Sequence, residues 1–187
     1  MGMKTVAVDY GTGQLPIEVP ESAVIVEQPK PPSVQDPEAA VRKALANPIG
    51  MPTIREWVKP NSTVTIGFDD PTRPSLPRQI AIPVIIEQLL EAGVQLEDIT
   101  LINSGCVHRK YTPKELRDYL GPKVFDMFET DPSVMRVINH DASDPDQLVR
   151  LGLSNTGDYM EYNRCLVDSD YVIYCGTIMP NNWGGAN

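Results

Sequence analysis

Four short apolar runs separated by helix-like stretches restrict the possible folds of this chain more than any other feature. The runs are typical of buried strands and comprise Val64 to Phe68, Ile99 to Ile102, Val134 to Ile138 and Tyr171 to Tyr174. Two intervening stretches predict helices, one at 78–92 ended by Gly93 and one at 112–120. Because crossover helices join parallel strands, the sequence predicts an α/β fold with a mostly parallel sheet and helices on both faces.

The segment before these runs predicts an N-terminal β-hairpin and one helix. Residues 4–8 and 15–19 alternate apolar and polar side chains on either side of Gly11-Thr12-Gly13. We interpret this Gly-containing segment as a turn, because it lacks the Gly-Lys-Ser/Thr ending of a phosphate-binding loop. A strand is predicted at Ala23 to Val26, followed by an extended Pro-rich connector, Pro29 to Pro32. Asp36 then caps a helix that runs through about Ala46.

Charge and composition exclude several classes of partner. The 187 residues allow one ordinary domain or two very small ones. The 16 Lys and Arg against 25 Asp and Glu give a net charge of −9, which disfavours nucleic acid and anionic membranes as partners. No apolar run reaches the ~20 residues of a membrane span, and Met1 to Lys4 lack a signal core, so we expect a cytoplasmic protein. Three cysteines without a CxxC spacing indicate neither a disulfide framework nor a zinc site.

Polar loops follow three of the predicted strands. They span residues 69–74, 104–109 and 176–181. Ligands of open α/β sheets bind outside the carboxyl ends of the strands, so we expect these loops to meet at one edge of the sheet.

The second loop carries a histidine close to a helix start. Thr112-Pro113-Lys114-Glu115 is a capping box, which fixes that start and holds His108 and Arg109 between a strand end and a helix N-terminus. One interpretation is an acid/base imidazole near a bound anion, and the other is a loop histidine with a structural hydrogen bond.

The first loop, Asp70-Pro71-Thr72-Arg73-Pro74, is stiffened by its prolines. In one interpretation Arg73 binds a carboxylate or phosphate through its planar guanidinium, with Asp70 orienting it or accepting a hydroxyl. In the other, Asp70 and Arg73 pair with each other across a turn. We also expect Arg73 and His108 to line a shallow pocket that holds a small anion at a helix N-terminus.

The other histidine and cysteines predict structural roles. We expect His140 to pair with Asp141 and Cys175 to pack in the core. Cys106 and His108 are two metal-binding side chains without companions, so no metal site is predicted.

An ordered set of motifs resembles the N-terminal domain of the nickel-dependent lactate racemase family. The set starts at Tyr10-Gly11 and continues with Asp70-Pro71-Thr72-Arg73-Pro74, Gly105 to Glu115 read as GxxHRxxTxxE, His140-Asp141, Asn163-Arg164, and Asp170-Tyr171-Val172-Ile173 with Gly176. The resemblance implies an α/β protein with two domains around a cleft, of which residues 1–187 match the first. The C-terminal domain of the same protein is then the expected partner.

The resemblance also implies a reaction. The family's cofactor is a nickel-pincer nucleotide, a pyridinium mononucleotide that takes hydride from the α-carbon of a small 2-hydroxy acid while a histidine removes the hydroxyl proton. Returning the hydride to the other face inverts the centre. His108 matches one of the family's two acid/base histidines, and Asp70, Pro71, Thr72 and Arg73 match its cofactor-contacting loop.

Two positions depart from the family pattern. Asn181 stands where the second histidine follows a Gly-x-x-x-Pro run, and an amide exchanges no proton at neutral pH. Asn187 stands where a lysine tethers the cofactor, and the nickel-binding histidine is expected beyond the last residue. We therefore expect the chain alone to be inactive.

Three hypotheses remain. The chain belongs to a racemase or epimerase acting on another 2-hydroxy acid, such as a larger sugar acid that Asn181 hydrogen-bonds. Alternatively, it binds a nucleotide or hydroxy acid without racemising it, or it is an interaction domain without a ligand.

Overall fold

The structure is a computed structural model that describes residues 2–26, 32–73, 76–105, 108–129, 137–178, 180–181 and 185–186. The chain divides into two compact units, Met1–Val34 and Gln35–Asn187, and each is described by itself. Within the described residues, no helix has the length and apolar character needed to cross a bilayer.

The first unit is a β-hairpin, as the sequence predicts. Strands β1 (Met3–Tyr10) and β2 (Gly13–Pro20) pair antiparallel, with Val6 opposite Ile17. Gly11 has a φ of 59° in the turn, a left-handed conformation that glycine adopts without steric cost. The predicted strand at 23–26 is wrong: the Ala23 N–H donates to the Pro20 carbonyl in a turn, and the residues after it join no ladder. Of the predicted connector, only Pro32 lies within the described residues.

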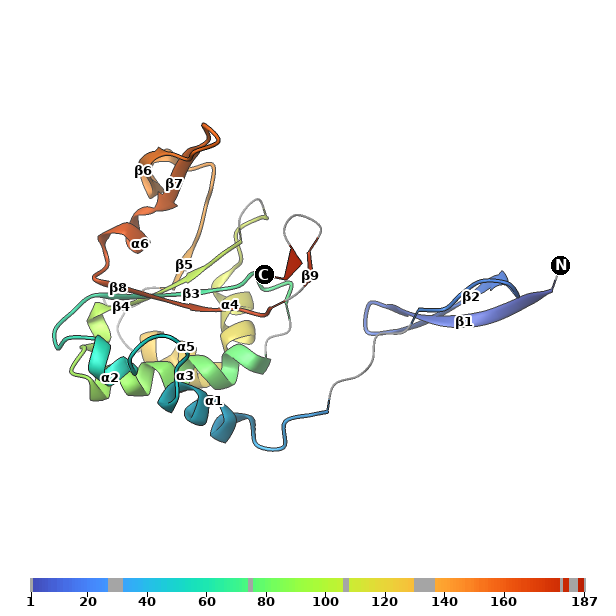
Figure 1. The fold of residues 1–187 in the computed structure, drawn as a ribbon, viewed down its shortest axis with the longest axis horizontal. Helices are drawn as coiled ribbons and strands as arrows, with labels where there is room; N and C mark the ends of the chain where they lie inside the picture. The colour runs from blue at the N-terminus through green and yellow to red at the C-terminus, as the bar shows by residue number, and fades with distance from the viewer. Residues whose placement is uncertain are drawn as a thin grey trace. The chain divides into compact units, whose positions relative to one another are not determined.

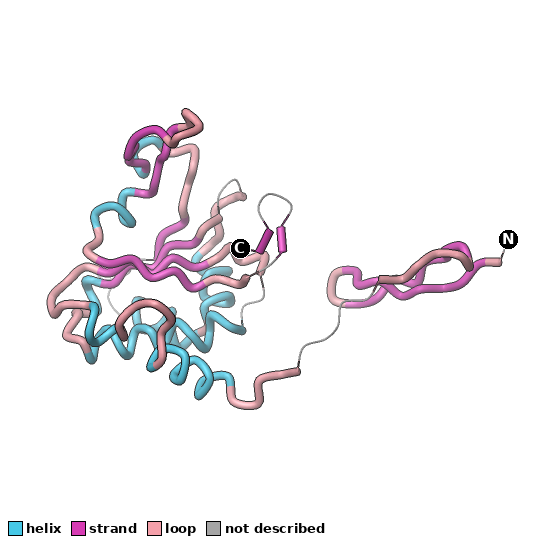
Figure 2. The backbone as a smooth tube through the Cα atoms, in the orientation of Figure 1, coloured by secondary structure: helices cyan, strands magenta, loops and turns pink. Residues whose placement is uncertain are grey.

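The second unit contains a four-stranded parallel sheet, shown in magenta in Figure 2. Its strands are β3 (Val64–Phe68), β4 (Ile99–Asn103), β5 (Val137–Asn139) and β8 (Tyr171–Cys175), in the order β5-β4-β3-β8. Ile66 of β3 lies opposite Leu101 and Ile173 in its two neighbours. The α/β class, the parallel sheet and the N-terminal hairpin predicted from the sequence are thus confirmed.

Helices lie on both faces of this sheet, but unequally (Figure 1). One side carries α1 (Pro37–Ala46), α2 (Ile54–Trp57), α3 (Leu76–Glu91), α4 (Pro113–Leu120) and α5 (Pro122–Glu129). The other side carries the short helix α6 (Arg164–Asp168), next to the hairpin of β6 (Leu148–Leu153) and β7 (Tyr159–Asn163), which the sequence analysis did not predict. Short 3₁₀ turns at Leu96–Asp98 and Pro145–Gln147 and the two-residue strands β9 (Pro180–Asn181) and β10 (Gly185–Ala186) complete the described elements.

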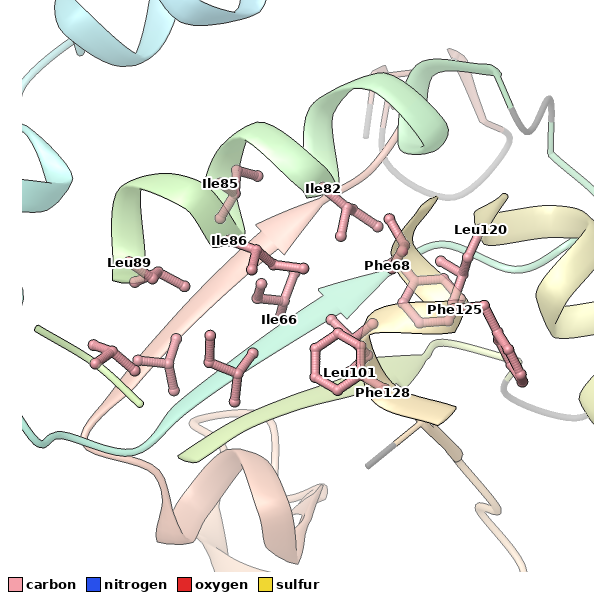
Figure 3. Close-up of a cluster of buried hydrophobic side chains, with 14 of the residues drawn as sticks. Ile66, Phe68, Ile82, Ile85, Ile86, Leu89, Leu101, Leu120, Phe125 and Phe128 are labelled. Atoms are coloured by element: carbon pink, nitrogen blue, oxygen red, sulfur yellow. The ribbon is translucent and has the colours of Figure 1, made fainter. Parts of the chain in front are cut away.

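Strand alternation determines which side chains enter the core. Ile66 and Phe68 of β3 and Leu101 of β4 are fully buried and face the side of α3, α4 and α5 (Figure 3). Thr65 points to the opposite face, where its hydroxyl donates to the Cys165 carbonyl of α6 at 2.9 Å. The larger helical layer therefore covers the apolar face, and the more polar face receives the short helix.

Candidate functional site

The three polar loops meet at the carboxyl edge of the sheet, as predicted. The Ser104 N–H donates to the Phe68 carbonyl at 2.8 Å, which joins the loops after β4 and β3. The Thr177 N–H donates to Asp69 Oδ2 at 2.9 Å, which joins the loops after β8 and β3. Parallel register places the three strand ends side by side, so residues far apart in sequence reach one site.

Asp70 and His108 form the centre of this edge. His108 Nδ1 lies 2.9 Å from Asp70 Oδ2, and Asp70 is only 7 % exposed. The Tyr111 hydroxyl donates to Asp70 at 3.1 and 3.2 Å, and the Thr72 N–H donates to Asp70 Oδ1 at 2.8 Å. Asp70 thus accepts hydrogen bonds from its own loop and from the segment that carries His108 and Tyr111.

These hydrogen bonds control the protonation of Asp70. Burial alone raises the pKa of the Asp70 carboxyl, but the donors on Thr72, His108 and Tyr111 outweigh it and lower that pKa below its usual value. An ionised carboxylate only accepts hydrogen bonds, so Nδ1 of neutral His108 carries the proton and Nε2 is the basic nitrogen. The His108 side chain is 50 % exposed, and within the described residues Nε2 makes no hydrogen bond. His108 therefore has one ring nitrogen bound to Asp70 and one without a protein partner in the described residues.

The capping box that follows His108 has the predicted geometry. The Thr112 hydroxyl accepts from the Glu115 N–H at 3.3 Å, and the Glu115 carboxylate accepts from the Thr112 N–H at 2.8 Å. Arg109, between the strand end and this helix start, pairs with Glu115 at 2.6 Å. Hydrogen bonds from Arg109 and then from Thr112 lower the pKa of Glu115 to about 2. Glu115 therefore both caps the start of α4 and takes up the charge of Arg109, and the anion expected near His108 stays a prediction.

Arg73 does not pair with the Asp70 carboxylate. Its backbone N–H donates to the Asp70 carbonyl at 2.9 Å, and its guanidinium donates to the Thr72 hydroxyl at 2.9 Å. In the described residues Arg73 forms no ion pair. The backbones of Asp70 and Arg73 therefore form a turn, as one interpretation predicted, but their side chains do not pair. Arg73 is exposed.

A cavity of about 350 Å³ lies beside Arg73. It is lined by Pro71, Arg73, Tyr111, Glu115, Asp118 and Tyr119. His108 is not part of this lining, so the predicted pocket shared by Arg73 and His108 is wrong in that respect. Both lining carboxylates have cations of their own, because Glu115 pairs with Arg109 and Asp118 with Lys114 at 2.6 Å. Arg73 thus supplies the unneutralised charge of the lining.

A second buried network, which the sequence analysis missed, supports the edge. Arg78 of α3 is 1 % exposed and forms an ion pair with Asp69. The Tyr119 hydroxyl donates to Asp69 Oδ1 at 3.0 Å, and burial raises the pKa of Tyr119 to about 12. Because Asp69 also accepts from Thr177, this network holds the loop after β8 against the loop after β3. The adjacent acidic pair Asp69-Asp70 after a buried strand was the available sequence signal.

The other predicted residues divide into three groups. His140 Nδ1 lies 3.2 Å from Asn163 Nδ2, whereas Asp141 pairs with Lys110, so the predicted His140–Asp141 pair is wrong. Cys175 is partly buried against the core, as expected. Cys106, the Asn181 side chain and Asn187 lie outside the part that the structure describes. Among the described side chains, no three His, Cys, Asp or Glu are grouped so as to hold a metal ion.

These features define an α/β domain of the class that binds ligands at the carboxyl edge of a parallel sheet. Comparison with known proteins gives a more specific result. The model of the family "Lactate racemase N-terminal domain" matches residues 10–185, and the chain belongs to this family.

Two curated relatives support this assignment. A lactate racemase of Thermoanaerobacterium thermosaccharolyticum is 25 % identical over 187 residues, which are 98 % of this chain and 42 % of the relative. A lactate racemase of Lactiplantibacillus plantarum is 25 % identical over 148 residues, covering 79 % of this chain and 33 % of the relative. The chain thus spans less than half the length of the curated relatives it matches.

A solved structure shares the fold. It is the lactate racemase apoprotein of T. thermosaccharolyticum, with a TM-score of 0.76 at 22 % identity, covering 98 % of this chain and 41 % of that one. The match extends over nearly all of this chain.

Proposed function

We propose that this chain is the N-terminal domain of a 2-hydroxy-acid racemase or epimerase in which His108 exchanges a proton with the substrate hydroxyl. The observation that carries this proposal is the 2.9 Å hydrogen bond between His108 Nδ1 and Asp70. It orients the ring and leaves Nε2 as the proton acceptor. Family membership supports the reaction class, and the 50 % exposure of the side chain supports access to a ligand.

The residues around His108 perform defined parts of the proton transfer. Nε2 accepts the hydroxyl proton as a general base, which forms an imidazolium, and returns it as a general acid. The Asp70 carboxylate stabilises that imidazolium through Nδ1–H, as a buried carboxylate does for other catalytic histidines. Tyr111 keeps Asp70 in place, because its hydroxyl contacts both carboxylate oxygens.

The cavity beside Arg73 fits part of the cofactor that the family resemblance implies. When bound, the nickel-pincer nucleotide supplies a pyridinium ring that accepts hydride from the α-carbon of the substrate. Arg73, whose guanidinium bonds only the Thr72 hydroxyl in the described residues, would hold its phosphate, with Pro71 and Thr72 beside it. The family resemblance implies that the nickel-binding histidine comes from the C-terminal domain of the same protein.

Asn181 favours a second candidate function. Its position matches the family's second acid/base histidine, and an amide cannot replace that histidine in proton transfer. A homologue with this change binds a nucleotide or hydroxy acid without inverting it. In the preferred function, Asn181 instead hydrogen-bonds a substrate larger than lactate, such as a sugar acid.

The test uses the longest native form of the protein, produced together with the enzymes that make the cofactor. Nickel and sulfur content measure cofactor loading, and chiral chromatography measures inversion of lactate and of longer 2-hydroxy sugar acids. Loading with inversion of at least one acid is the expected result. Loading without any inversion favours the binding function, and a protein that neither loads nor inverts contradicts both.

A further inference from the structure

We propose that Asn103 and Asn139 are a pair of positioning residues that clamp both ends of the loop carrying His108. This inference rests on the proposed role of His108 and adds two residues whose hydrogen bonds go to the described loop backbone and to each other, not to the imidazole ring. The two asparagines end neighbouring strands, β4 and β5, and lie opposite each other in the parallel register.

Asn103 holds the start of the loop. It is 1 % exposed, and its Oδ1 accepts from the Gly105 N–H at 3.1 Å and from the His140 N–H at 3.3 Å. Its Nδ2 donates to Asn139 Oδ1 at 2.9 Å, which links the two amides. Asn103 thus uses both ends of its amide inside the protein.

Asn139 holds the end of the loop. Its Oδ1 accepts from the Tyr111 N–H at 3.0 Å, and its Nδ2 donates to the Tyr111 carbonyl at 3.0 Å. One side chain therefore binds both backbone groups of the residue whose hydroxyl contacts Asp70. Fixing the Tyr111 backbone fixes the position of that hydroxyl, and through Asp70 the orientation of His108.

The chemistry of the clamp explains why amides occupy both positions. An amide carries an acceptor oxygen and a donor nitrogen on one rigid group. A carboxylate has no donor, and the side chain of serine or threonine carries a single polar atom closer to the backbone. The paired amides also join β4 to β5 through their side chains at the last residue pair of the ladder. Loss of one amide releases one end of the loop while the sheet core, formed by other residues, keeps its packing.

The first test observes His108 directly in the 187-residue chain. At about pH 8.5 an ordinary imidazole is neutral, and long-range ¹H–¹⁵N spectra distinguish its two tautomers. The chain has only two histidines, so His140→Gln assigns the signals. We expect the wild-type ring to carry its proton on Nδ1. In Asn139→Ala, a large part of the population is expected to shift to the Nε2–H tautomer.

Asn163→Ala is the matched control. Asn163 is also buried, at 4 % exposed, and caps α6 while bonding His140 and Gln147. Its side chain makes no hydrogen bond to the described residues of the His108 loop. This variant is expected to change the His140 signals and leave the His108 tautomer unchanged. An equal shift of the His108 tautomer in both variants would mean general loosening and would overturn the clamp.

Asn139→Asp keeps the inference testable if the alanine variant does not fold. The carboxylate retains the acceptor for the Tyr111 N–H but cannot donate to the Tyr111 carbonyl, so a smaller tautomer shift is expected. A folded Asn139 variant with the wild-type His108 tautomer overturns the proposal.

Kinetics of the cofactor-loaded full-length protein separate this inference from the proposed function. A misplacement of about 1 Å costs up to ~10²-fold in rate, so Asn139→Ala is expected to lower kcat by about that factor with little change in KM. If His108→Ala leaves turnover intact while Asn139→Ala shifts the tautomer, the proposed function fails and the clamp stands. If the tautomer is unchanged in Asn139→Ala while His108→Ala strongly lowers turnover, the clamp fails and the proposed function stands.

Discussion

His108 Nδ1 lies 2.9 Å from Asp70 Oδ2, and this contact joins loops that leave two neighbouring parallel strands. The two residues are 38 positions apart in the chain. Tyr111 and Thr72 also bond the buried Asp70 carboxylate and hold it in place. Nδ1 of His108 therefore has a fixed partner, while Nε2 is left for proton exchange in the proposed function.

The lowered pKa of Asp70 predicts a pH-dependent contribution to stability. The pKa of the Asp70 carboxyl is lower in the folded protein than in the unfolded chain, where it is about 3.9. Such a group stabilises the folded state at pH values above its pKa in the unfolded chain, and this contribution is lost as the pH falls through its pKa in the folded protein. We therefore expect Asp70→Asn to lower the free energy of unfolding more at about pH 7 than at about pH 3.5. Urea unfolding of both proteins at both pH values measures this. A difference that does not change with pH would contradict the ionised, hydrogen-bonded carboxylate.

The capping box at Thr112 predicts a stability change without a charge change. Thr112→Ala removes the acceptor for the Glu115 N–H and is expected to lower the free energy of unfolding by about 1 kcal/mol. Thr112→Ser is the control, because serine caps helices as well as threonine does. Equal stability of the alanine and serine variants in denaturant titrations would show that the box contributes nothing.

The cavity beside Arg73 predicts weak anion binding by the 187-residue chain. Titration calorimetry with nicotinic acid mononucleotide is expected to show binding that Arg73→Ala abolishes, because Arg73 carries the unneutralised charge of the lining. Arg150→Ala removes the same charge from strand β6, where Arg150 pairs with Glu161, and is expected to bind as the wild type does. If both variants weaken binding equally, the effect is one of net charge and not of this cavity.

Local patterns in the sequence predicted the parts of the fold that depend on local interactions. Strand β3 and the capping box at Thr112 were predictable because burial and capping leave a signature within a few residues. The β6–β7 hairpin was missed because a register shift between Arg150 and Gly152 interrupts the alternation that marks a strand.

The partners within the site were less predictable. The sequence suggested Arg73 as the protein partner of Asp70, whereas the structure pairs Asp70 with His108, because the parallel register of β3 and β4 brings their loops together. The contacts of Asn139 with Tyr111 join positions 28 residues apart and left no local signal.

Racemisation by the chain alone is expected to be undetectable. The match covers only 42 % of the T. thermosaccharolyticum racemase, and Asn181 cannot exchange a proton at neutral pH. Purified 187-residue protein, incubated with D- or L-lactate and analysed by chiral chromatography, is expected to leave each enantiomer unchanged. Inversion at a rate proportional to protein concentration would show that this domain is a complete enzyme.

Turnover of the cofactor-loaded full-length protein with His108→Ala tests the central claim most directly. Loss of a general acid or base lowers rates by ~10²–10⁴-fold, and the exposed position of His108 means that unfolding free energy should change little. His140→Gln is the control, because it keeps the backbone N–H that bonds Asn103 and changes only the side chain that contacts Asn163. We expect inversion of the 2-hydroxy acid to fall by that factor in His108→Ala and to remain near wild type in His140→Gln. Near-normal turnover in a folded, loaded His108→Ala protein would contradict the proposed proton transfer and leave His108 as a structural residue.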